Sequence, residues 1–257
     1  MPKRGESPVG APVWVDLFTS DIDRVRPFYE TLFGWTSAGG PPDYDHYVNF
    51  AKDGALVAGC APRERFTRRP DTWNVYLRTE DVSATIDETI AHGGSLLHPA
   101  TTIGDLGTMA FVTDVGGASV GIWKPQSHPG FGRVAEPGAA AWFELQTRDY
   151  DACVDFYREV FHRDVQVVSD TSAYPYTMLV QGDDGLFGIV DATRLLKHDQ
   201  AAHWSVYFGT ADTDATLARA VERGGRVIEP PEDTPYGRLA VAADPTGAVF
   251  KLMRSHA

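Results

Sequence analysis

The sequence predicts an α+β protein of two tandem domains, and three observations carry this prediction. The chain of 257 residues repeats itself, because residues 14–21 (WVDLFTSD) return as residues 142–149 (WFELQTRD). Residues 73–76 (WNVY) return in the same way as residues 204–207 (WSVY). Each half also divides into two units in which a strand precedes an Asp-capped helix, and short strands separated by glycine turns complete each unit. A repeat of this length indicates the architecture before any single motif is considered.

The first unit shows the pattern most clearly. Residues 14–18 alternate as a strand does, and Asp21 stands where a helix N-cap belongs. The apolar residues that follow have the spacing of one buried helix face: Val25, Phe28, Tyr29, Leu32 and Phe33. Gly34 is expected to end this helix. Because Pro27 removes one backbone donor, we expect it to kink the helix or to confine regular geometry to its second half.

The second unit follows the same plan, and units three and four repeat it. Asp81 is predicted to cap a helix over residues 82–92 that ends at two glycines. The side of this helix predicted to be buried carries Val82, Ile86 and Ile90. The four units and a segment rich in proline and glycine divide the chain into a tail (1–11), a first domain (12–125), a linker (126–139) and a second domain (140–257).

Charge and hydropathy exclude several classes of function. The formal net charge of −12 would repel a phosphate backbone, so nucleic acid is not an expected partner. The sequence contains no apolar run of the roughly 18 to 20 residues that a membrane helix needs, and no signal-peptide pattern follows the first residues. We therefore expect a soluble cytoplasmic protein, either a monomer or a homodimer.

The plan of strand, helix and three strands resembles the vicinal oxygen chelate superfamily, which contains glyoxalases, extradiol dioxygenases and bleomycin-resistance proteins. The most specific signs are Phe28-Tyr29 with the sequence LFGW at residues 32–35, the partner segment at 156–161, and the closing turn DPTG at 244–247. Within that superfamily the chain is similar to two-domain glyoxalase-like proteins of actinobacteria. The resemblance implies that the sheet of each domain curls into an open cup that holds the ligand.

The resemblance also implies where a metal would bind. Metal-dependent members take their ligands from three strand positions, and counting the same spacings gives Trp14, Asn74 and Gly121 in the first cup and Trp142, Ser205 and Lys251 in the second. Zinc, iron and manganese need imidazole, carboxylate or thiolate donors, which these residues do not supply. We therefore expect no metal and no other cofactor. A shift of two residues along a strand, which would bring Asp16 or His203 to the ligand position, is the alternative.

Strand alternation predicts which side chains line the cups. Those expected to bind a ligand are Trp14, Phe18, Asn74, Tyr76, Arg78 and Trp123 in the first cup, and Trp142, Gln146, His203, Ser205, Tyr207 and Met253 in the second. Tyr236 lies in a loop that is either a lip over the second cup or an ordinary turn. Aromatic walls with a few polar groups suit a flat organic molecule. The alternative is that these aromatic residues simply fill each cup as core.

Two hypotheses for the function follow. The first is metal-independent binding of an aromatic or polyketide-like small molecule, for sequestration, resistance or biosynthesis. The second is a cofactor-independent lyase, isomerase or hydrolase, with Glu144 or Asp16 as the base and Lys251 or Arg78 stabilising an oxyanion. Opposite charges of this kind also occur as purely structural pairs. A metal-dependent glyoxalase or dioxygenase with a nonstandard site is a third and weaker hypothesis.

Overall fold

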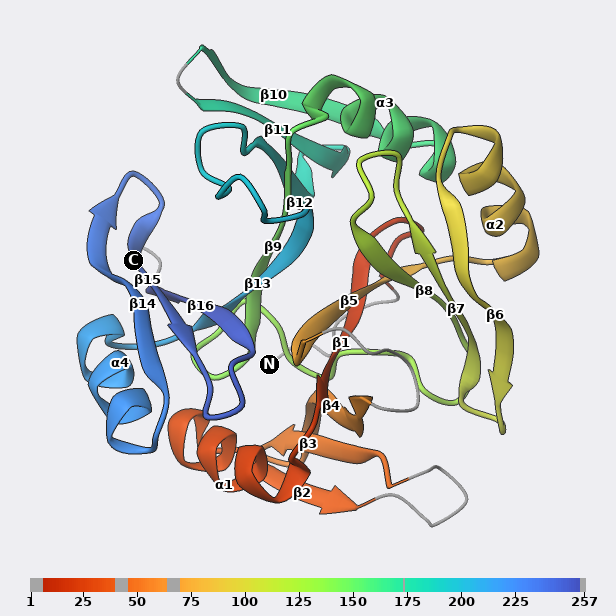
Figure 1. Ribbon diagram of the computed structural model, residues 1–257. Helices are drawn as coiled ribbons and strands as arrows, with labels where there is room; N and C mark the ends of the chain where they lie inside the picture. Colours follow the sequence, from red (N-terminus) through yellow and green to blue (C-terminus); the bar gives the residue numbers. More distant parts are fainter. Residues whose placement is uncertain (1–6, 40–45, 64–69, 173, 255–257) are drawn as a thin grey trace.

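A computed structural model describes residues 7–39, 46–63, 70–172 and 174–254. Within these residues the strands form two eight-stranded sheets, one from each half of the chain (Figure 1). The first sheet consists of β1 (Pro12–Thr19), β2 (Thr36–Gly39), β3 (Val48–Lys52), β4 (Ala55–Pro62), β5 (Thr72–Arg78), β6 (Ser95–Ile103), β7 (Gly107–Thr113) and β8 (Ser119–Pro125). The second consists of β9 (Ala140–Thr147), β10 (Asp164–Thr171), β11 (Tyr174–Gln181), β12 (Asp184–Asp191), β13 (His203–Gly209), β14 (Arg226–Thr234), β15 (Gly237–Ala243) and β16 (Val249–Arg254).

The two sheets have the same topology, which confirms the tandem α+β fold predicted from the repeat. The strand order is β2-β3-β4-β1-β5-β8-β7-β6 in the first sheet and β10-β11-β12-β9-β13-β16-β15-β14 in the second. In each sheet the first strands of the two units are antiparallel neighbours at the centre, with Asp16 opposite Asn74 in one sheet and Glu144 opposite Ser205 in the other. The central strands therefore bring the predicted cup residues of both units together.

Four helices of the described chain lie outside the sheets: α1 (Ile22–Phe33), α2 (Val82–Ala91), α3 (Tyr150–Phe161) and α4 (Thr213–Glu222). The Asp21 side chain caps α1 by accepting a hydrogen bond from the Arg24 N–H, and Gly34 ends the helix with a φ of 70°. This positive φ favours glycine because it has no Cβ. The predicted start and end of this helix are therefore confirmed.

Two details of the predicted helices are wrong. Helix α1 runs from Ile22 through Pro27 to Phe33, so the expectation that Pro27 confines helical geometry to the second half is wrong. The proline removes one internal hydrogen bond without ending the helix. In α2 the buried side chains are Val82, Thr85 and Thr89, whereas Ile90 is 53% exposed. The buried face of α2 is thus rotated toward the threonines, whose apolar methyl groups suit a buried helix face.

The two halves interlock through their helices. Phe33 of α1 packs against Phe208 of β13, with ring centres 5.1 Å apart, and the Tyr29 hydroxyl donates to Asp244 Oδ2 at 3.0 Å. In the reciprocal contact, the Tyr157 hydroxyl of α3 donates to Asp114 Oδ2 at 2.9 Å. Figure 1 shows α1 beside α4 and α2 beside α3, on opposite sides of the molecule. Buried apolar residues of both halves therefore form one continuous core.

No helix in the described part of the chain is both long enough and apolar enough to cross a membrane.

Candidate functional site

A buried carboxylate, Glu144 of β9, organises the polar part of the second cup. Three donors converge on its Oε1 atom, each at 3.0 Å: the amide of Gln146, the hydroxyl of Tyr207 and the ammonium of Lys251. Lys251 also donates to the Tyr207 hydroxyl at 2.9 Å, and its Nζ atom lies 4.6 Å from the centre of the Tyr207 ring. None of the described residues donates a hydrogen bond to Oε2 of Glu144. The pairing of Lys251 with Glu144 expected from the sequence is present, and it leaves one carboxylate oxygen available to a ligand.

An aromatic wall stands beside this carboxylate. The indole N–H of Trp142 donates to the Tyr176 hydroxyl at 2.8 Å, and the rings of Tyr174 and Tyr176 stack with centres 5.6 Å apart. Burial is the main cause that raises the pKa of both tyrosines, and the charge of Glu144 is the second. Their hydroxyls therefore stay protonated at neutral pH. Trp142, Tyr174 and Met178 are only half-buried, which leaves part of each side chain accessible.

The sequence did not lead us to expect Tyr174 and Met178 at this cup. The pattern that could have indicated them is the alternation of Tyr174, Tyr176 and Met178 along β11, which places these side chains on one face of the strand. The wall of the second cup thus continues from β9 onto β11.

Two polar residues of β13 complete the second cup at its rim. His203 lies opposite Gln146, and Ser205 lies opposite Glu144. His203 Nδ1 is 3.0 Å from the carbonyl oxygen of Ala201, and because a carbonyl only accepts, Nδ1 carries the proton and Nε2 is an acceptor. Burial lowers the pKa of His203, so the ring is neutral at pH 7.

Met253 and Tyr236 border the same cup from β16 and from the turn between β14 and β15. Met253 is half-buried, whereas the Tyr236 side chain is 54% exposed. The Tyr236 backbone N–H donates to the Thr234 hydroxyl at 3.2 Å, as in an ordinary turn. Burial raises the pKa of Tyr174 most, the charge of Glu144 raises it further, and Tyr236 adds a smaller electrostatic effect.

The equivalent carboxylate of the first cup, Asp16, has different partners. The Tyr76 hydroxyl donates to Oδ2 at 2.7 Å, and the Asn74 amide donates to Oδ1 at 3.0 Å. Burial raises the pKa of Asp16 to about 7, although the hydrogen bonds from Tyr76 and Asn74 oppose the change. The first cup therefore holds a carboxyl group that is partly protonated at neutral pH.

The expected pairing of Arg78 with Asp16 is wrong. Arg78 Nη2 lies 2.7 Å from a carboxylate oxygen of Glu80, and the Arg78 backbone N–H donates to Ala11. Asn74 is the residue of β5 that stands opposite Asp16, so Arg78 lies four positions further along the strand. At about 3.3 Å per residue this separation is roughly 13 Å, too far for the two side chains to pair.

The inner aromatic residues of the first cup are covered by the segment that links the two halves. The Trp14 ring centre lies 4.5 Å from that of His128 and 5.6 Å from that of Phe131. The Trp123 indole donates to the His128 carbonyl at 3.2 Å, and Trp14 and Trp123 are only 5% and 7% exposed. In this cup the aromatic side chains pack as core, which is the alternative that the sequence left open.

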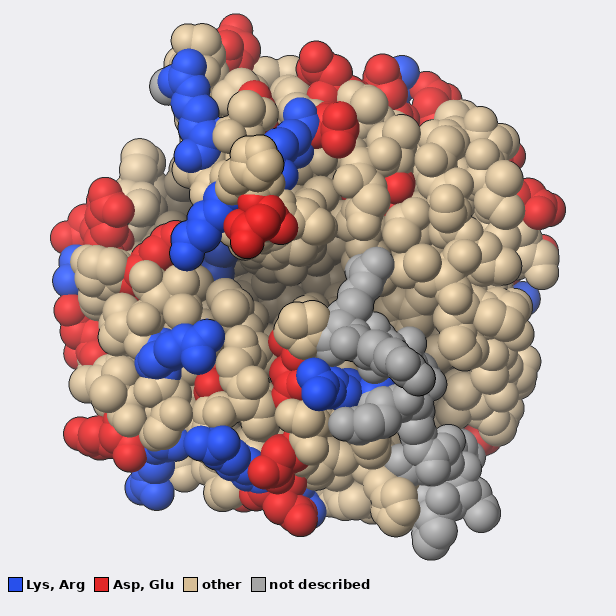
Figure 2. Space-filling view, viewed as in Figure 1, with Lys and Arg blue, Asp and Glu red and all other residues tan. Residues whose placement is uncertain are grey.

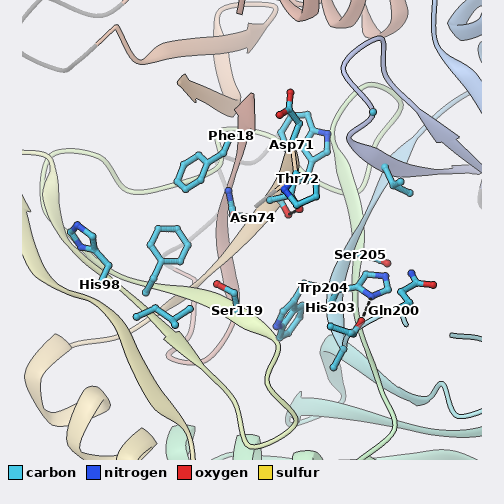
Figure 3. A pocket seen from close by; sticks show the side chains of 18 residues that line it. Phe18, Asp71, Thr72, Asn74, His98, Ser119, Gln200, His203, Trp204 and Ser205 are labelled. Carbon is cyan, nitrogen blue, oxygen red and sulfur yellow. Dashed lines mark hydrogen bonds between the residues drawn. The ribbon is translucent and has the colours of Figure 1, made fainter. Parts of the chain in front are cut away.

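A cavity of about 540 Å³ lies between the rims of the two cups. Phe18, Asn74, His98 and Ser119 line it from the first half, and Gln200, His203 and Ser205 line it from the second (Figure 3). Figure 2 shows a hollow near the centre of the molecule, with charged residues at its left edge and uncharged residues along much of the rest. We call this cavity the inter-cup groove.

The fold and the site define a class of protein: a fused pair of curled mixed sheets with one packed cup and one accessible cup. A family model described as the Glyoxalase/Bleomycin resistance protein/Dioxygenase superfamily matches residues 11–122 and 139–252. The chain belongs to this superfamily, as the resemblance of its motifs implied.

Individual relatives agree with this assignment. The chain is 38% identical over 259 residues to the putative glyoxylase CFP32 of Mycobacterium tuberculosis, covering 99% of this chain and 98% of the relative. It is 32% identical over 272 residues to the anthracycline biosynthesis protein DnrV of Streptomyces peucetius, covering 95% and 93%.

Solved structures share the fold at low sequence identity. The 2,3-dioxygenase LapB of Pseudomonas sp. KL28 matches with a TM-score of 0.66 at 13% identity, covering 98% of this chain and 94% of that one. The Mn(II)-bound glyoxalase of Novosphingobium aromaticivorans matches with a TM-score of 0.65 at 14% identity, covering 96% and 83%.

The residues at the expected metal positions do not fit a metal. In the first cup the Trp14 indole donates to the Tyr47 hydroxyl, and the Asn74 amide donates to Asp16. In the second cup Lys251 brings a positive charge to the ligand position and binds the nearby Glu144. Among the described residues no group of three His, Cys, Asp or Glu side chains is arranged to hold an ion. The donors present thus differ from the imidazole and carboxylate sets that divalent transition metals prefer.

Proposed function

We propose that the second cup binds a flat, aromatic, polyketide-like small molecule without a metal ion, either to sequester it or as a step in natural-product metabolism. The observation that carries this proposal is the contrast between equivalent positions of the two cups. Trp14, Phe18 and Trp123 are buried in the first cup, whereas Trp142, Gln146 and Met253 remain half-buried in the second. Accessible aromatic walls beside a small polar cluster are typical of sites for organic ligands.

The composition of the second cup supports an aromatic ligand. Trp142 and the stacked pair of Tyr174 and Tyr176 offer ring faces for stacking, while Glu144 and Lys251 can fix the orientation of a phenol or a carbonyl group. The relative DnrV is named an anthracycline biosynthesis protein. Anthracyclines contain fused aromatic rings, so that name is consistent with this class of ligand.

A substitution that fills the second cup with a tryptophan, as Trp123 fills the first cup, tests the proposal. Met253 and Trp123 occupy equivalent positions, since each pairs with the last residue of the neighbouring parallel strand. We expect Met253→Trp to lower the affinity for emodin, a tricyclic aromatic polyketide, at least tenfold by isothermal titration calorimetry. The matched control Trp123→Met should leave the affinity unchanged. Equal affinities in the wild type and Met253→Trp would contradict the placement of the ligand.

Proton transfer is a second candidate function, and the geometry of Glu144 favours it. The three donors to Oε1 hold the carboxylate in place, and Oε2 is without a donor among the described residues, as a general base requires. Lys251 and Tyr207 lie close enough to stabilise negative charge on a ligand oxygen near the same carboxylate. In this function Glu144 would take a proton from an acidic C–H or O–H group of the ligand.

The two functions differ in the expected effect of Glu144→Gln. This change keeps the shape of the side chain and an acceptor for Lys251 but removes the base, so a binding protein should retain emodin affinity within about threefold, a change below 1 kcal/mol. An acid-base enzyme should lose turnover of its substrate while still binding it. Asp16→Asn is the matched control, because it makes the same chemical change in the packed cup.

A further inference from the structure

The inter-cup groove contains several polar groups that the protein itself does not satisfy. Within the described residues, the hydroxyls of Ser119 and Ser205 make no hydrogen bond, and Asn74 uses its amide hydrogens on Asp16 while its carbonyl oxygen accepts nothing. His203 binds the Ala201 carbonyl through Nδ1, which leaves Nε2 as an acceptor. All four side chains are half-buried. Half-buried polar groups of this kind need hydrogen bonds from water or from a ligand.

The described residues that line the groove carry little net charge. The acidic residue among them, Asp71, is already engaged, since Oδ2 accepts from the Ser20 hydroxyl at 2.8 Å and Oδ1 lies 3.1 Å from Arg63. His203 is uncharged at neutral pH because burial lowers its pKa. A phosphate or carboxylate would therefore find no lysine or arginine among the described lining residues, whereas neutral hydroxyl groups would find both donors and acceptors.

The groove adjoins the second cup. Ser205 and His203 belong to the groove lining and stand directly opposite Glu144 and Gln146 in the sheet. On the far side, Phe18 packs against Phe111 with ring centres 5.7 Å apart, and both rings line the groove. These two rings are almost fully buried, and the exposed apolar surface of the groove comes from Leu97 and Val249, which are 47% and 48% exposed. Apolar surface beside hydroxyl and amide groups is suited to a sugar, whose C–H groups pack on the apolar side chains while its hydroxyls form hydrogen bonds.

We propose that the inter-cup groove binds a neutral, polyhydroxylated substituent of the ligand, such as an O-linked sugar, while the aromatic part lies in the second cup. This inference rests on the function proposed above. It makes the site bipartite: the second half holds the ring system, and the rim of the otherwise packed first cup recognises its substituent. The protein should consequently prefer a glycosylated aromatic compound over the bare ring system, and it should bind one molecule per chain.

The test compares emodin with emodin-8-O-glucoside by isothermal titration calorimetry, together with matched aglycone and glucoside pairs of a flavone and of a tetracyclic polyketide. We expect at least one glucoside to bind about tenfold more tightly than its aglycone, with one site per chain.

Two substitutions should block the groove: Ser119→Phe from the first half and Val249→Phe from the second, where Val249 is 48% exposed and easily replaced. Each should reduce glucoside affinity to that of the aglycone and leave aglycone binding unchanged. Lys124→Phe, an exposed position on the same strand as Ser119, is the control and should have no effect.

The outcomes separate this inference from the function on which it rests. Equal affinity for every aglycone and glucoside, with both groove variants behaving like the wild type, would overturn the groove site. If the Met253→Trp variant then still failed to bind the aglycone, the proposed function would remain supported. Failure of all three pairs to bind would remove both proposals.

Discussion

Replacing Asp16 by asparagine should change how the stability of the protein depends on pH. Asp16 is buried beneath the first cup and is held by Tyr76 and Asn74, and burial raises its pKa from the ordinary value of 3.8 to about 7. Because the folded-state pKa is the higher one, the folded protein binds this proton more tightly than the unfolded chain. The stability linked to this proton is fully present below the unfolded pKa and is lost as the pH rises through the folded pKa.

The magnitude follows from the size of the shift. Between pH 5 and pH 8 the proton leaves the folded state but is already absent from the unfolded chain. At about 1.4 kcal/mol per pH unit, the wild-type protein should lose roughly 3 kcal/mol of unfolding free energy over this range through Asp16 alone. An asparagine side chain cannot titrate, so the Asp16→Asn variant should lack this contribution.

Urea unfolding of the two proteins at pH 5 and pH 8 measures the difference. Asp114, whose pKa burial raises to about 6, titrates in both proteins and cancels in the comparison. The free-energy difference between Asp16→Asn and the wild type should therefore move by roughly 3 kcal/mol in favour of the variant as the pH rises. Parallel pH profiles for the two proteins would show that Asp16 is ionised at pH 5, and the reasoning from burial would be refuted.

Two further substitutions test the packing that positions the second cup. Tyr29→Phe removes the hydrogen bond to Asp244 between the two halves and leaves a buried carboxylate with one donor fewer. The unfolding free energy should therefore fall by about 1 to 3 kcal/mol at pH 7. An unchanged urea midpoint would contradict this expectation. Gly188→Ala would place a methyl group against the Tyr176 hydroxyl, which must move away from Trp142. We expect a changed tryptophan emission spectrum and weaker emodin binding, and an unaltered spectrum would show that the wall is less tightly packed than its geometry indicates.

The sequence predicted the fold because its strongest signals are local and repeated. The cap at Asp21 and the terminal Gly34 require only neighbouring residues, and both were correctly assigned. Alternation along β9 and β16 likewise placed Glu144 and Lys251 on the same side of the sheet, where they form an ion pair. Short-range patterns of this kind do not depend on distant packing.

Other features of the site depend on distances that a sequence pattern does not contain. Alternation put Arg78 and Asp16 on one face of the sheet but could not show how far apart they lie along it. The covering of the first cup by His128 and Phe131 was not predicted, because the segment that carries them has no periodicity. The groove between the cups depends on how the two sheets dock, which no motif in either half encodes.

The reciprocal bonds from Tyr29 to Asp244 and from Tyr157 to Asp114 have a consequence for how this chain could diverge. Each half buries the closing turn of the other, so neither half could be expressed alone without exposing an apolar helix face and an acidic group that has lost its tyrosine donor. Aromatic residues can therefore fill one cup, as Trp14 and Trp123 do in the first, while the opposite cup remains free to change its chemistry. Fusion of the two copies in a single gene permits this division of labour, which a symmetric pair of identical chains could not attain.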